Sequence, residues 1–71
     1  MLDITTTKEV VKKLEAYPGM TPKGYTLAFA TVYFLTTRHF PTNDEFITTF
    51  AALIQAGDVR MSEAGEMTLA R

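Results

Sequence analysis

The hydrophobic pattern of this chain changes period at Gly57, and this change limits the possible folds more than any other feature. Before Gly57 the apolar residues recur every three or four positions, as they do on one face of a helix. After Gly57 they alternate with polar residues, as they do in a half-buried strand. The sequence therefore predicts one α+β domain over residues 1–71, mainly α with a C-terminal β-hairpin.

The register of the hairpin follows from a loop at 63–65 with Gly65 at positive φ. The cross-strand pairs are then Met61 with Met67, Val59 with Leu69, and Arg60 with Thr68. The four apolar side chains share one face in this register, and a slip of one residue would separate them.

The first helix is predicted to start at a capping box and to stop at Pro18. In Thr6-x-x-Glu9 each side chain can bond a free backbone N–H at the helix start. The apolar stripe that follows consists of Val10, Val11, Leu14 and Tyr17.

The second helix is predicted over residues 22–38, with Thr21 as the N-cap and Pro22 at the first helical position. A strand is the alternative, because residues 25–35 are apolar on nearly all sides and rich in aromatic and β-branched side chains. The length of the run and the cap favour a helix. Such a helix is expected at the centre of the domain, ending near His39.

The third helix has the most clearly marked start, because Thr42-x-x-Glu45 is a second capping box and Pro41 can pack on Phe46. Gly57 is expected to end it in a left-handed conformation. The predicted buried stripe is Phe46, Ile47, Phe50, Leu53 and Ile54. The predicted outer face is Glu45, Thr48, Thr49, Ala52 and Gln55.

This order of elements, three helices with a short turn before the third and then a hairpin, resembles the winged helix-turn-helix superfamily. In that superfamily the third helix usually enters the DNA major groove and the hairpin, or wing, contacts the DNA backbone or minor groove. The resemblance places Glu45, Thr48, Thr49, Ala52 and Gln55 of the third helix, with Arg60 of the wing, at the nucleic acid, and all of these except Glu45 are candidate contacts.

Basic residues offer a further edge for phosphate contacts, with Lys8 and Lys12 on the first helix and Arg71 joining Arg60 on the hairpin. The opposing observation is the net charge of −1 and the pI near 5.7, which do not favour binding by phosphate neutralisation. The same lysines can serve solubility alone, and the outer face of the third helix can simply be solvated.

A protein partner is the alternative to DNA. The aromatic group exceeds the needs of a small core, so some of it is expected at a partner surface, with a homodimer as the expected assembly. The group consists of Tyr25, Phe29, Tyr33, Phe34 and Phe40, and Tyr25, Phe29 and Tyr33 are the named partner-binding candidates.

Catalytic chemistry is not expected. The chain has no cysteine and one histidine, and its only serine, Ser62, is in the hairpin, so neither a nucleophile pair nor a metal-ligand cluster is available. We expect no cofactor, no metal and no small-molecule substrate. The apolar run at 25–35 is too short to span a bilayer and the N-terminus lacks a signal-peptide pattern, which predicts a cytoplasmic protein with no membrane partner.

Overall fold

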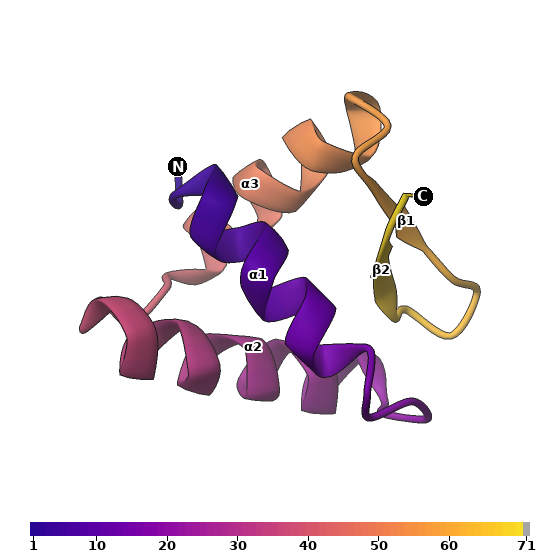
Figure 1. Cartoon of the computed structure of the whole chain (residues 1–71), viewed down its shortest axis with the longest axis horizontal. Coiled ribbons are helices and arrows are strands. Elements are labelled where there is room, and N and C mark those ends of the chain that lie inside the picture. Colours follow the sequence, from indigo (N-terminus) through magenta and orange to yellow (C-terminus); the bar gives the residue numbers. More distant parts are fainter. Residues whose placement is uncertain (71) are drawn as a thin grey trace.

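The computed structural model describes residues 1–70 and has three helices and a hairpin (Figure 1). The helices are α1 (Ile4–Leu14), α2 (Pro22–Thr37) and α3 (Asn43–Gln55), and the antiparallel strands are β1 (Val59–Met61) and β2 (Met67–Leu69). The predicted α+β class is confirmed, and residues 25–35 are helical. Arg71, predicted as a cation of the hairpin, lies outside the described residues.

Helix α1 begins earlier than predicted, because Asp3 and not Thr6 is its N-cap. The Asp3 carboxylate accepts hydrogen bonds from the backbone N–H of Thr6 at 2.8 Å and from its hydroxyl at 2.7 Å. These bonds lower the pKa of Asp3. The helix stops at Leu14, so Tyr17 leaves the predicted stripe and is exposed in the turn to α2.

The caps of α2 and α3 agree with the sequence. Thr21 accepts a bond from Gly24 N–H at 3.1 Å. Thr42 and Glu45 form the complete capping box. At the other end of α3, Gly57 has a φ of 81°, and the N–H groups of Gly57 and Asp58 bond the carbonyls of Ile54 and Leu53. These bonds satisfy two backbone carbonyls at the end of α3, as expected where a glycine in the left-handed conformation ends a helix.

The core is centred on Phe29, which is fully buried on α2. Its ring meets Phe46 and Phe50 of α3 edge-on, with centroids 5.3 and 5.1 Å apart. Helix α1 packs on α2 and on β2, while β1 packs on α3. Figure 1 shows the result: the α2–α3 turn lies at one side of the domain and the hairpin at the opposite side.

Two predictions about burial are wrong. Helix α2 is not buried all round, because α1 and α3 cover one side of it, and Leu27 and Leu35 on its outer side are about 60% exposed. On α3, Ile47 and Ile54 are exposed at 56% and 39%, because the core lies on the side of Phe46, Thr49, Phe50 and Leu53.

The hairpin has the predicted register, and Gly65 has a φ of 87°. Val59 and Met67 are buried, but Met61 is 58% exposed, so its predicted place in the buried face is wrong. Met61 is the last residue of β1, where the strand enters the loop.

Three contacts hold the hairpin against the helices. Glu15 accepts a bond from Leu69 N–H at 2.8 Å, and Glu66 accepts one from Gly19 N–H in the α1–α2 turn at 3.0 Å. Lys8 pairs with Asp58 at 3.4 Å. The hairpin is therefore docked along α1 and does not project freely.

A matched pair of substitutions tests this docking. Gly19 and Gly65 have nearly the same φ, 90° and 87°, but a Cβ at Gly65 would lie 2.7 Å from Pro22 Cγ, whereas one at Gly19 would meet nothing within 4 Å. We expect Gly19→Ala to lower the free energy of unfolding by about 1 kcal/mol through backbone strain. Gly65→Ala should lose a further ~1 to 3 kcal/mol from the clash. Urea unfolding measures both, and equal losses would contradict the docked loop.

Candidate functional site

The predicted DNA-contacting face of α3 is only partly exposed. Thr48, Ala52 and Gln55 lie on the surface. Thr49 is fully buried, and its hydroxyl accepts a hydrogen bond from Leu2 N–H at 2.9 Å. The prediction of Thr49 as a base-contacting residue is wrong, because this side chain ties the N-terminal segment to α3.

The predicted cations do not form one free edge. The ammonium of Lys8 is paired with Asp58, which directly precedes β1. Lys12 is exposed on α1, and Arg60 is exposed on β1 opposite Thr68. The Asp58 carboxylate therefore lies beside the lysine expected to link α1 with the hairpin, and it offsets that positive charge.

Of the aromatic group, Phe34 and Phe40 are exposed, but the three named partner-binding candidates are core residues. Tyr25, Phe29 and Tyr33 are 2%, 0% and 4% exposed. They follow each other at four-residue spacing and face α1 and α3, so this prediction is wrong. The Tyr33 hydroxyl accepts a bond from Asp3 N–H at 3.0 Å. Burial, with Glu15 and Glu66 nearby, raises the pKa of Tyr25.

Two groups of exposed apolar side chains lie on α2 and α3, and of their residues sequence reasoning included only Phe34 in a set expected at the surface. On α2 they are Leu27, Phe34 and Leu35, on the side opposite Phe29. On α3, Asp44, Ile47, Ala51 and Ile54 follow at helical spacing, and we call these four residues the α3 face. Their helical positions relative to Phe29 and Phe50 are the signal that could have identified both groups.

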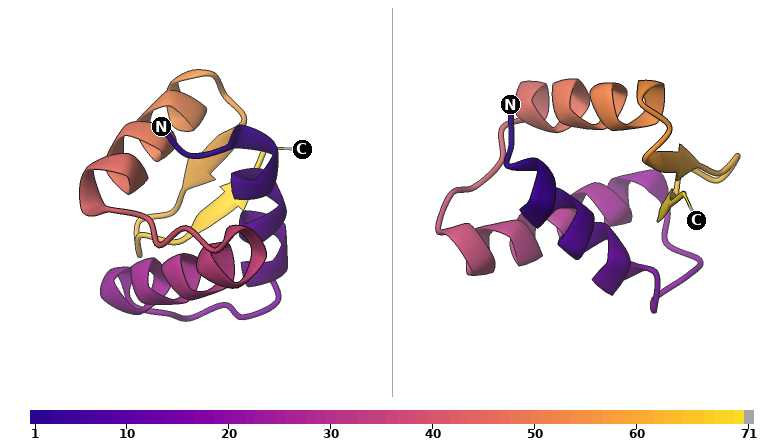
Figure 2. Two further views of the ribbon diagram at one scale, coloured as in Figure 1. Left: turned by 90° about the vertical axis from the view of Figure 1, so that its left-hand side faces the viewer. Right: turned by 45° about the horizontal axis from the view of Figure 1, so that its top comes forward.

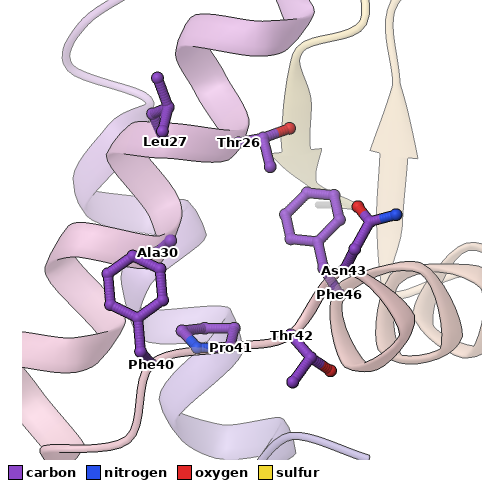
Figure 3. Close-up of a pocket in the computed structure, with 8 residues that line it drawn as sticks. All are labelled: Thr26, Leu27, Ala30, Phe40, Pro41, Thr42, Asn43 and Phe46. Atoms are coloured by element: carbon purple, nitrogen blue, oxygen red, sulfur yellow. The ribbon is translucent and has the colours of Figure 1, made fainter.

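An open hollow of about 200 Å³ lies where α2, the following turn and the start of α3 meet (Figure 3). The Phe40 and Phe46 rings stand on either side of it, with Pro41 and Thr42 in the chain between them. Its remaining lining residues are Thr26, Leu27, Ala30 and Asn43. Asn43 is one helical turn from Ile47, so the hollow borders the α3 face.

The turn beside this hollow is held by His39 and Glu45. The Nε2 atom of His39 lies 2.8 and 3.1 Å from the two carboxylate oxygens of Glu45. Glu45 also accepts a bond from Thr42 N–H at 3.0 Å. The Thr42 bond and then the His39 contact lower the pKa of Glu45 to about 2. This carboxylate is engaged in the turn, which leaves Asp44 as the exposed charge at the start of α3.

Within residues 1–70, no group of three or more histidine, aspartate or glutamate side chains is arranged to hold a metal ion. No described helix is long and apolar enough to cross a bilayer.

Comparison of the chain with protein-family models, curated proteins and solved structures finds no match. The resemblance to the winged helix-turn-helix superfamily stays a prediction, and the function is inferred from the surface chemistry of this chain.

The burial of Thr49 generates a prediction with its neighbour as control. Thr49→Val keeps the shape of the side chain and removes the acceptor of the buried Leu2 N–H, so it should lower the free energy of unfolding by about 1 to 3 kcal/mol. Thr48→Val, at an exposed position one residue away, should change it by less than about 0.5 kcal/mol. Urea unfolding of both variants measures the difference. Equal effects would contradict the assigned role of Thr49.

The turn generates a prediction on pH. The pKa of Glu45 is lower in the folded state than its ordinary value of 4.5, so its contribution to stability is present above that value. The contribution is lost as the pH falls toward 2. Glu45→Gln should therefore be less stable than the parent chain at neutral pH, and the gap should close on acidification. Thermal unfolding from pH 7 to 2 measures it. Asp44→Asn is the control, and a gap independent of pH would contradict the Glu45 assignment.

Proposed function

We propose that this domain is a non-enzymatic protein-binding module whose partner docks on the α3 face. The observation that supports the proposal is the chemistry of that surface. Ile47 and Ile54 are 56% and 39% exposed and lie on one stripe with the small Ala51 between them. An exposed apolar stripe on a helix is typical of a surface that another protein covers.

The charge on α3 also favours a protein over DNA. The helix contains no lysine or arginine, and its first turn contains Asp44 and Glu45. A helix that enters a DNA groove brings its side chains between two rows of phosphates, where these carboxylates would be repelled. The same Asp44 beside an aliphatic stripe suits a partner helix with aliphatic side chains and a lysine or arginine at one end.

Duplex DNA is the second candidate, supported by the order of elements and by the exposed Lys12 and Arg60. The docking of the hairpin against α1 weakens this candidate, because the loop that would act as a wing tip contacts Pro22 and Gly19 within the domain.

The test selects peptides from a displayed random library on the immobilised full chain and measures the winners, as synthetic peptides, by titration calorimetry. We expect amphipathic sequences with a basic residue. Ile54→Glu should weaken their binding by about tenfold or more, because a carboxylate would be buried against aliphatic side chains. Ala52→Glu adds the same charge on the other side of α3 and should change the affinity by less than about threefold.

A second arm titrates labelled random-sequence duplex DNA at two salt concentrations. We expect no saturable binding at the lower salt. Saturable binding that falls steeply with salt and weakens with Arg60→Ala would overturn the protein-binding proposal in favour of DNA.

A further inference from the structure

The outer side of α2 is an uncharged and exposed surface. At its edge the Phe34 ring lies 5.9 Å from the Phe40 ring between centroids, and Leu27 borders the hollow beside Phe40. No charged residue occurs between Lys23 and Arg38. In Figure 1, α2 lies along the lower edge of the domain with α1 and α3 above it. The left view of Figure 2 also shows α2 as the lowest of the three helices. The exposed residues on its outer side are Leu27, Thr31, Phe34 and Leu35.

The threonines of α2 need no water for their hydroxyl protons. Each hydroxyl donates to the carbonyl four residues earlier, at 2.9 Å for Thr31 to Leu27 and at 2.9 to 3.0 Å for Thr26, Thr36 and Thr37. Covering this side of α2 would therefore leave no threonine hydroxyl without an acceptor. The free-energy cost of removing water from this surface is low for that reason.

The residues of α2 around Thr31 are arranged symmetrically, with the partly buried Ala28 at the margin of the outer side. Leu27 and Leu35 lie four residues before and after it, and Ala28 and Phe34 lie three residues before and after it. An identical helix that crosses antiparallel at Thr31 would set its Leu35 beside Leu27 and its Phe34 beside the small Ala28. Leu27, Thr31 and Leu35 form one ridge at four-residue spacing, the kind of ridge by which helices most often pack.

We propose that a second copy of this chain covers α2, in a two-fold symmetric dimer with the two α2 helices antiparallel and crossing at Thr31. A two-fold interface is self-complementary, so each outer residue meets the same patch of the other copy. A charged surface would be repelled by the same charge on the other copy. An uncharged surface avoids this repulsion, and it packs well where large residues lie opposite small ones.

The size of this surface sets the expected affinity. A helix of 16 residues is about 24 Å long, and one side of it offers less than the ~800 Å² that each partner buries in a standard interface. We therefore expect a dimer that dissociates at micromolar concentration. The dimer uses a different surface from the α3 face. A negative result for the dimer would therefore not contradict the protein-binding proposal, and the reverse also holds.

Sedimentation of the full chain over a broad concentration range tests the dimer. We expect a reversible monomer–dimer equilibrium for the parent chain. Leu27→Lys and Leu35→Glu, each at an exposed position, should each raise the dissociation constant about tenfold or more, because a charge is buried against leucine. Circular dichroism checks that both variants keep their helices.

Mixing the two variants tests the antiparallel arrangement. The lysine of one variant would meet the glutamate of the other, so the mixture should associate more tightly than either variant alone. The double variant should also recover association, whereas a parallel pair would set like charges together. Ile47→Lys, on α3, is the control and should leave the equilibrium unchanged.

Cross-linking gives a second measurement, because the chain has no cysteine of its own. Thr31→Cys places one thiol at the two-fold axis and should form a covalent dimer on oxidation much faster than Thr36→Cys, an exposed position off the outer side. A parent chain that remains monomeric up to about millimolar concentration, or equal cross-linking of the two variants, would overturn the proposal.

Discussion

The fold depends on the packing of the Phe29 ring between the α2 and α3 helices. Phe29 is fully buried and meets Phe46 and Phe50 edge-on, and those two rings are themselves 4.6 Å apart. Each aromatic pair adds about 0.5 to 1.5 kcal/mol to the burial of its area. Because these rings fix which side of α2 faces α3, they also fix which sides of the two helices remain in solvent. The exposed stripes of both helices are consequences of this one contact.

A small domain with a single ring cluster cannot cover all of its apolar residues. A chain of this length buries only about 60% of the surface of its unfolded form. With α1 and α3 on the same side of α2, Leu27, Phe34 and Leu35 stay exposed, although the Phe34 ring lies 5.9 Å from that of Phe40 between centroids. The domain has an apolar surface on two helices and an acidic residue where a DNA-binding helix would approach phosphate. This combination favours protein partners over DNA.

The hairpin has a structural role that the comparison with a wing does not suggest. Glu15, at the end of α1, accepts a hydrogen bond from Leu69 N–H of the hairpin. Glu66 of the hairpin accepts one from Gly19 N–H in the α1–α2 turn, and Asp58 before β1 pairs with Lys8 of α1. Gly65 lies so close to Pro22 that no side chain fits between them. The hairpin therefore closes one end of the core with Val59 and Met67, while Arg60 and Thr68 lie on its exposed outward side.

The sequence by itself determined the local features of this protein: the caps at Thr21 and Thr42, the stop at Gly57, and the register of the hairpin. Each depends on hydrogen bonds or steric limits among residues that are close in the chain. Tertiary structure alone decided that Thr49 is buried and that Ile47, Ile54 and Leu35 are exposed. A helix with apolar residues on several sides has no intrinsic inner face. Its inner face is the side that another element covers, and here that side was set when Phe29 packed against α3.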